Sequence, residues 1–145
     1  MSGRQRRRQP ELELPKVVLD TGALIALDEQ HPIERVRDLV AAAAATERRL
    51  HLPAVVVAEW WRGDNLAHHR GAKMFKVEPV TDPIARAAGL ALKDVSKDRR
   101  ITASMTIDAI VMATAASLGA VVYTSDFDDL DRFTRSFGSV RVFTV

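Results

Sequence analysis

The sequence predicts an α/β domain with a mainly parallel β-sheet, and two observations support this. Short apolar runs of strand character alternate with helical segments, and no hairpin signal joins two of the strands. The chain has 145 residues, of which 47% are hydrophobic and 28% charged, which is enough to bury one sizeable core. We therefore expect helices to connect strands that run in the same direction.

Elements of the N-terminal half follow from local patterns. We expect strands at 16–19 and 50–52, a short helix at 23–27 and a longer helix at 33–49, where apolar residues recur every three or four positions. The stretch 53–63 is open to two interpretations. Val55–Val57 favours a strand, whereas Pro53 before it and Gly63 after it favour a helix.

The C-terminal half gives clearer helix boundaries. Asp82 and Pro83 resemble an N-cap and first-turn pair that opens a helix through Val95. Thr106 is the predicted cap of a helix at 107–118, which Gly119 ends. Residues 96–104 are expected to form a basic loop, and strands are expected at 120–123 and 140–145.

Positive charge is concentrated at the N-terminus. Residues 1–16 hold five Lys or Arg and two Glu, whereas the remaining residues hold 16 basic and 17 acidic side chains. We expect residues 1–15 to be a basic, disordered arm and residues 16–145 to be the domain. Such an arm can attract nucleic acid, or it can be a solvated tail.

Composition excludes several classes of protein. The chain has no cysteine, so disulfides and thiolate metal sites are excluded, and a cytoplasmic location is expected. No apolar run reaches the roughly 18 residues that a membrane span needs, and the N-terminus lacks the apolar stretch of a secretory signal.

Four acidic residues stand out, and two of them occupy the carboxyl ends of strands, where parallel α/β proteins bind ligands. Asp20 and Asp126 follow expected strands, Asp108 lies near an expected helix start, and Glu59 lies among valines and tryptophans. Each has an ordinary alternative: an Asx turn for Asp20, an N-cap for Asp126, a helix-dipole contact for Asp108 and an exposed helix edge for Glu59. Their joint placement favours a common site.

Acids that converge need a counter-charge, because like charges within ~4–6 Å raise one another's pKa. Oxygen ligands without cysteine or histidine suit a hard cation, Mg²⁺ with Mn²⁺ as a substitute. A site of this kind can hold a phosphodiester and activate water for in-line attack.

Three motifs carry a resemblance to a known family. VVLDTGALIAL at 17–27, AVVVAEWWRG at 54–63 and TIDAIVMATAASLGAVVYTSDFDDL at 106–130 resemble, in order and spacing, the acidic motifs of PIN-domain ribonucleases. The closest likeness is to VapC-type toxins of type II toxin–antitoxin systems. The resemblance covers residues 16–145 and implies a three-layer PIN-like fold, with a central, mainly parallel sheet flanked by helices.

The resemblance also implies roles for individual residues. Asp20, Glu59, Asp108 and Asp126 match the catalytic acids, and Glu59 then lies on a helix. Asp20, Asp108 and Asp126 are expected to bind the metal ion, with Asp128 as a further ligand.

Other polar and aromatic residues are expected to have lesser roles. Asp129 and Asp131 are interpreted as helix-start and surface acids. The basic residues of the 96–104 loop either guide a phosphate backbone or are solvated; they are Lys97, Arg99 and Arg100. His51, His68 and His69 are interpreted as structural or exposed. Trp60 and Trp61 cannot both be buried on one helix face, so one of them is expected in the core.

The implied function is a Mg²⁺-dependent endoribonuclease that acts on RNA as a toxin, with a VapB-type antitoxin as partner and a homodimer as its assembly. The alternative is a non-catalytic docking module that keeps the PIN-like scaffold. A receiver-like signalling domain is a poor match, because its required lysine near the last strand is absent.

Overall fold

The computed structural model describes residues 15–28, 34–45, 48–65, 73–98 and 100–145. Almost all of the basic arm predicted for residues 1–15 lies outside these ranges, as do His68, His69 and Arg99. In this part of the chain no helix is both long and apolar enough to span a membrane.

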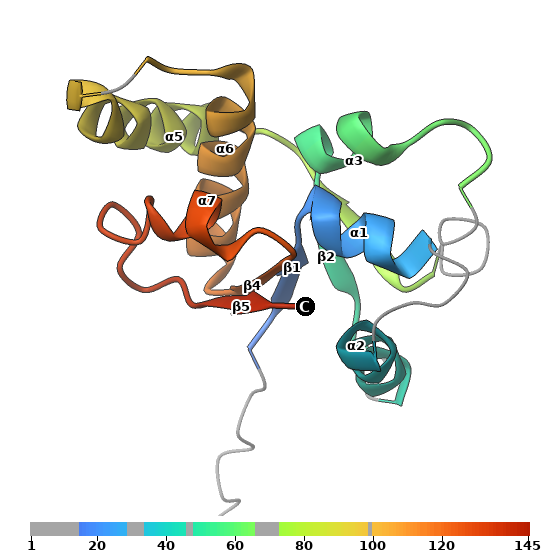
Figure 1. Ribbon diagram of the computed structural model, residues 1–145. Coiled ribbons are helices and arrows are strands. Elements are labelled where there is room, and N and C mark those ends of the chain that lie inside the picture. Colours follow the sequence, from blue (N-terminus) through green and yellow to red (C-terminus); the bar gives the residue numbers. More distant parts are fainter. Residues whose placement is uncertain (1–14, 29–33, 46–47, 66–72, 99) are drawn as a thin grey trace, which may run out of the picture.

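A five-stranded sheet forms the centre of the described chain (Figure 1). The strands stand in the order β3-β2-β1-β4-β5, and every neighbouring pair is parallel. They are β1 (Val17–Leu19), β2 (Leu50–Pro53), β3 (Phe75–Glu78), β4 (Val121–Thr124) and β5 (Val142–Thr144). The predicted α/β fold with a parallel sheet is thus confirmed.

The strand order reverses at β1, because the chain first builds outward through β2 and β3 and then returns to add β4 and β5 on the other side. Open parallel sheets bind their ligands beyond the carboxyl ends of the strands at such a switch point. The carboxyl ends of β1 and β4 are therefore where a site is expected.

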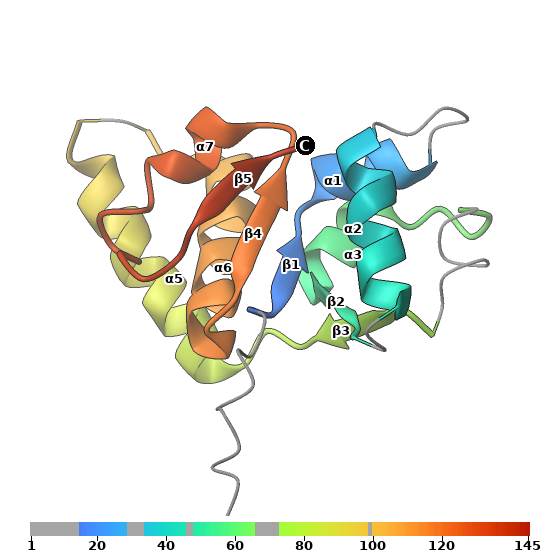
Figure 2. The ribbon, with the colours of Figure 1, turned by 90° about the horizontal axis from the view of Figure 1, so that it is seen from below.

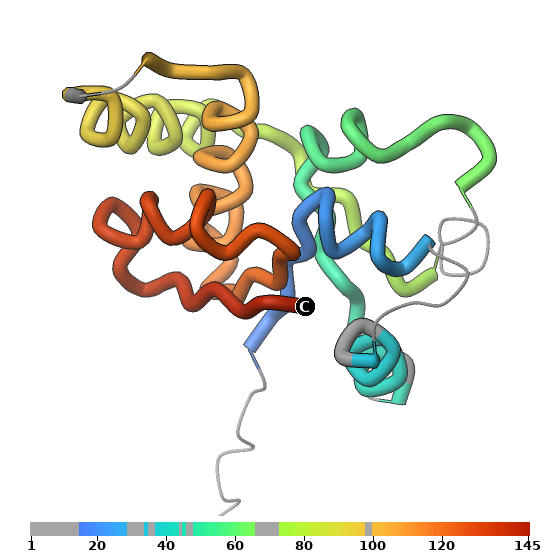
Figure 3. The backbone as a smooth tube through the Cα atoms, viewed as in Figure 1, coloured from blue at the N-terminus to red at the C-terminus, as the bar shows by residue number. Residues whose placement is uncertain are grey.

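Helices flank the sheet. They are α1 (Thr21–Asp28), α2 (Glu34–Ala45), α3 (Ala54–Trp60), α5 (Asp82–Val95), α6 (Ala103–Leu118) and α7 (Phe127–Asp131), with a short 3₁₀ turn η1 (Ser96–Asp98). Helix α6 packs against β1, β2 and β4, and α5 packs on α6. Figure 3 shows α1 beside α3, and Figure 2 shows α2 on the side of β1 away from β5.

The core lies between α6 and the sheet. Its largest fully buried side chains come from the strands and from α1, α3, α6 and the segment around α7: Val18, Leu19, Leu24, Leu50, Leu52, Val56, Val111, Met112, Val122, Leu130 and Phe133. Most belong to the apolar runs from which the strands and helices were predicted. Trp60 is also buried and donates its indole N–H to Asp28 Oδ2 at 2.7 Å, whereas Trp61 is half-buried.

Two helix starts differ from the prediction. The N-cap of α5 is Thr81, whose Oγ1 accepts the backbone N–H of Ile84, so Asp82 is already helical. The N-cap of α6 is Thr102 rather than Thr106, and Thr106 lies inside the helix. At each start the sequence holds more than one residue that can cap a helix, Thr81 and Asp82 for α5 and Thr102, Ser104 and Thr106 for α6, and in both cases the earliest threonine is the N-cap.

Other boundaries also differ. Helix α2 ends at Ala45 and not at Arg49, and the Arg48 N–H donates to the Ala43 carbonyl at 3.0 Å. The ambiguous stretch 53–63 contributes Pro53 to β2 and then forms α3, which ends at Trp60. Strand β3 was not predicted, because Phe75–Glu78 is a short, partly exposed edge strand with a weak apolar pattern.

Candidate active site

The first carboxylate stands where β1 meets α1. Asp20 is half-buried, and its Oδ1 accepts the backbone N–H of Ala23 at 3.0 Å, so it caps the start of α1. Its Oδ2 accepts a short hydrogen bond from the Thr124 hydroxyl. Burial nevertheless raises the pKa of Asp20, because these hydrogen bonds do not offset the lost solvation, and the negative charge of Asp126 raises it further.

Thr124 joins the ends of β1 and β4. This fully buried hydroxyl donates to Asp20 and accepts the backbone N–H of Asp126 at 2.9 Å. The carbonyl of the preceding residue, Tyr123, accepts the Asp20 N–H at 3.1 Å. Sequence reasoning assigned no role to Thr124, although its place directly before Ser125 and Asp126 was a usable signal.

Asp108 comes from the second turn of α6, because the helix begins four residues earlier than its predicted start. Burial first, and then repulsion from Asp129 and Asp20, raises the pKa of Asp108 to about 7. Arg132 lowers the pKa and Glu59 raises it further. Asp108 therefore does not lie in the first turn of its helix, where the alternative of a helix-dipole contact would place it.

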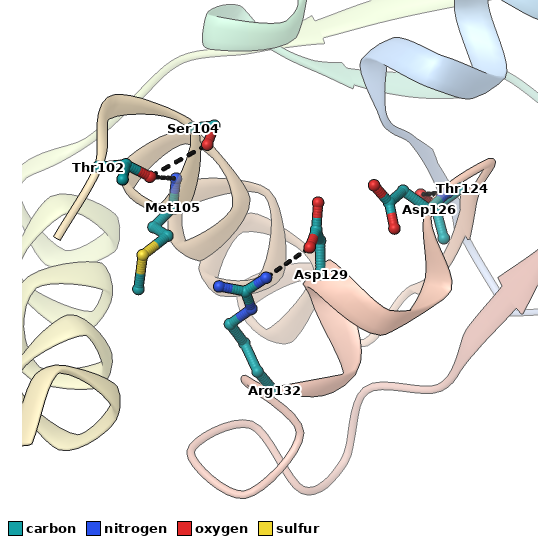
Figure 4. Close-up of polar contacts among 7 residues, drawn as sticks. All are labelled: Thr102, Ser104, Met105, Thr124, Asp126, Asp129 and Arg132. Atoms are coloured by element: carbon teal, nitrogen blue, oxygen red, sulfur yellow. Dashed lines mark hydrogen bonds and ion pairs between the residues drawn. The ribbon is translucent and has the colours of Figure 1, made fainter. Parts of the chain in front are cut away.

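The fourth strand leads into a pair of interacting acids. Asp126 is exposed at the start of α7, and a hydrogen bond with the Asp129 side chain is the main factor that raises its pKa. Asp129 also accepts from Arg132 Nη2 at 2.5 Å. In Figure 4 the Asp129 carboxylate stands between Arg132 and Asp126.

Asp129 lies in the first turn of α7, as expected of a helix-start acid, but it is also half-buried and acts on the pKa of both Asp108 and Asp126. Asp128, the expected further ligand, is exposed and is the last of the groups that raise the pKa of Asp126. Asp131 is exposed, as expected. The helical turn of α7 explains the difference, since it points neighbouring residues in different directions.

Glu59 is exposed on α3, and its Oε1 accepts the hydroxyl of Thr21 at 2.6 Å. The bond ties α3 to the first residue of α1, beside Asp20, so Glu59 is at the edge of the acidic cluster. Arg62 bonds backbone carbonyls, including that of Trp61 at 2.7 Å. His51 is buried, and its Nδ1 lies 2.7 Å from Glu78 Oε1, which makes it a structural residue.

The acids Asp20, Asp108, Asp126 and Asp129 thus come from β1, α6 and the β4–α7 segment and influence one another electrostatically. All of their ligand atoms are carboxylate oxygens, and this donor set suits a hard divalent cation. Across the described ranges, however, no three acid or histidine side chains already form a group that could hold a metal ion. The donor chemistry fits Mg²⁺, but the side chains are not gathered around a metal position.

Comparison with known proteins decides the family. The PIN domain family model matches residues 17–135, which include all of these acids. The chain belongs to the PIN-domain family. The resemblance drawn from the three motifs is confirmed, and so is the PIN-like fold that it implied. The search of curated proteins gives no match.

Solved structures share this PIN fold at low sequence identity. DNA-bound VapBC from Salmonella typhimurium aligns with a TM-score of 0.66 and 19% identity over 90% of this chain and 98% of that chain. FitAcB from Neisseria gonorrhoeae aligns with a TM-score of 0.61 and 23% identity over 88% of this chain and 96% of that chain. VapBC2 from Rickettsia felis, bound to a promoter DNA fragment, aligns with a TM-score of 0.65 and 13% identity over 89% and 98%.

Proposed function

We propose that the protein is a Mg²⁺-dependent endoribonuclease of the VapC type, the toxin of a type II toxin–antitoxin system acting on cytoplasmic RNA. The observation that carries the proposal is the acidic cluster of this PIN domain, where burial first, and then repulsion from Asp129 and Asp20, raises the pKa of Asp108 to about 7. Neighbouring acids whose pKa values are raised by burial and by one another's charge are typical of a site that binds a cation or transfers a phosphoryl group.

In the proposal Asp20, Asp108 and Asp126 hold the metal ion, and Asp129 is a better candidate than Asp128 for a further contact because it faces the cluster. When bound, Mg²⁺ supplies a Lewis acid that stabilises negative charge on the phosphate and helps water to lose a proton.

The chain's own side chains then orient the acids. Thr124 donates to Asp20 and fixes that carboxylate, and Arg132 fixes Asp129. Thr21 holds Glu59 at the edge of the site. In the metal-free protein, the carboxyl group of Asp108 gains or loses a proton near neutral pH. These side chains form an anionic surface that needs a cation before it can accept an RNA phosphate.

The partners are part of the proposal. The solved neighbours are named as VapBC and FitAcB assemblies, and both VapBC structures are bound to DNA. We therefore propose an antitoxin of the VapB type and a homodimeric toxin. The alternative function, a non-catalytic docking module, would keep the fold and the partner but not the chemistry.

The test is cleavage of total bacterial RNA by the purified full chain in Mg²⁺ and in EDTA. Asp20→Asn and Asp108→Asn are the active-site variants, and Asp131→Asn is the control, because Asp131 is an exposed acid of the same segment. Mg²⁺-dependent fragments with the wild type and the control, but not with the other two, support the nuclease. Folded protein that cuts nothing leaves the docking module. Cutting that survives both substitutions contradicts the assignment of Asp20 and Asp108 to the active site.

A further inference from the structure

A hollow lies beside the sheet, on the side that carries α2. A cavity of about 900 Å³ is lined by residues of α2, of β1, β2, β4 and β5, and of the C-terminal end of α6. In Figure 2, α2 and β5 stand on opposite sides of β1. The cavity is separate from the acidic cluster, none of whose acids lines it.

Aromatic and apolar side chains form one wall. Tyr123 and Phe143 are register partners on β4 and β5, and their rings stack with centroids 5.4 Å apart and planes at 27°. Phe143 is 42% exposed, so part of its ring is available to a ligand. An exposed aromatic pair on an open sheet face is a platform on which a planar group can stack.

The rest of the lining is basic. Lys16, Arg48, Arg49 and Arg141 border the cavity, and no Asp or Glu is among its lining residues. Within the described ranges Lys16, Arg49 and Arg141 take part in no ion pair. A hollow lined by charges of one sign concentrates its field and attracts an anionic ligand.

The cavity is also linked to the acidic cluster. The Tyr123 carbonyl accepts the Asp20 N–H, and the next residue, Thr124, bonds the Asp20 carboxylate. Lys16 precedes Asp20 by four residues, which along a strand is roughly 13 Å. A linear polyanion held at the cluster could therefore continue into the cavity within a few nucleotides.

We propose that this cavity, with the stacked Tyr123–Phe143 pair and its basic rim, binds a single-stranded stretch of RNA that flanks the bond to be cut. The inference rests on the proposed ribonuclease function. A base stacks on Phe143 and Tyr123, and neighbouring phosphates contact Arg141, Arg49 and Lys16. An acidic peptide would satisfy the charges but has no need of the aromatic platform, which is why RNA is favoured.

The experiment measures binding without cleavage. Fluorescence anisotropy is recorded in EDTA with the full chain carrying Asp108→Asn and a labelled single-stranded RNA of roughly 12 nucleotides, a length that such grooves cover. Adding Phe143→Ala should weaken binding at least about fivefold, the lower end for a lost base stack. Adding Arg141→Gln should lower the slope of log affinity against log salt by about 0.7.

Matched controls lie on α5. Lys93→Gln and Leu90→Ala remove an exposed charge and an exposed apolar side chain away from the cavity, and both should leave RNA affinity unchanged. Arg141→Lys keeps the charge and should keep most of the affinity. Circular dichroism of each variant checks that it is folded.

Unchanged RNA affinity in folded Phe143→Ala and Arg141→Gln overturns the proposal. A second result also overturns it: both variants lose affinity for a peptide of alternating Glu and Leu but keep their affinity for RNA. The cavity would then bind an acidic peptide. The two proposals fail separately. If Phe143→Ala and Arg141→Gln weaken RNA binding but the wild type never cleaves RNA, RNA binding in the cavity is supported and the nuclease function is rejected. If the wild type cleaves RNA but these variants bind it normally, the nuclease function is supported and RNA binding in the cavity is rejected.

Discussion

Replacing Asp108 by Asn should stabilise the metal-free protein above neutral pH. Asp108 is held where burial and neighbouring acids raise its pKa from 3.8 to about 7, so its ionised form is disfavoured in the folded state. Three pKa units correspond to at most about 4 kcal/mol. Because Asp108 is only partly buried, solvent screening reduces this to about 2 kcal/mol.

The sign follows from proton binding. Between about pH 4 and pH 7 the folded state keeps the Asp108 proton that the unfolded state has lost, so stability falls as pH rises through this window. Asn cannot ionise and does not lose this stability. The advantage of Asp108→Asn should therefore be full at about pH 8, shrink as pH falls, and vanish below about pH 4.

Thermal unfolding in EDTA, followed by circular dichroism, measures the effect. For a chain of this size about 2 kcal/mol corresponds to a rise in Tm of roughly 6–8 °C at about pH 8. Asp131→Asn is the matched control, because it removes an exposed charge and should change Tm little. Added Mg²⁺ should then stabilise the wild type and the control but not Asp108→Asn. A variant no more stable than the wild type at about pH 8, or an advantage that does not depend on pH, would refute the reasoning.

Further predictions concern single contacts. Thr81→Ala removes the N-cap of α5 and should lower the free energy of unfolding in urea by about 1 kcal/mol; no loss would mean that another group caps the helix. Phe133→Ala empties a fully buried site and should cost about 3–5 kcal/mol in the same assay, and a cost under about 1 kcal/mol would contradict its place in the core. A Cβ on Gly22 would lie 1.9 Å from Ser125 Oγ, so Gly22→Ala should cost about 1–3 kcal/mol, and adding Ser125→Gly should recover most of it; a double variant no better than the single one would disprove the clash. Thr124→Val removes the donor to Asp20 and should weaken Mg²⁺ binding measured by calorimetry, and unchanged affinity would show that Thr124 does not orient the site.

The spacing of apolar residues and the positions of proline, glycine and capping residues were enough to predict most of the fold. The strands β1, β2, β4 and β5 lie within or overlap the short apolar runs from which they were predicted, and β2 ends at the proline that was expected to close it. Gly119 adopts φ 62° at the end of α6, as expected of a residue that tolerates the left-handed region. The edge strand β3 was not predicted from the sequence, because its partial exposure leaves only a weak apolar pattern.

The sequence by itself determined most of the elements, and it placed Asp20, Glu59, Asp108 and Asp126 near their ends, because strand and helix signals are local. It could not decide which acids face one another. Asp129 and Asp128 are neighbours in the sequence, yet the turn of α7 and the packing of α7 on α6 turn only Asp129 toward Asp108. Likewise, Tyr123 and Phe143 become a stacked pair only when β4 and β5 align in register. Contacts between distant segments depend on the rotation and register of whole elements, and these are set by the packing of the complete core.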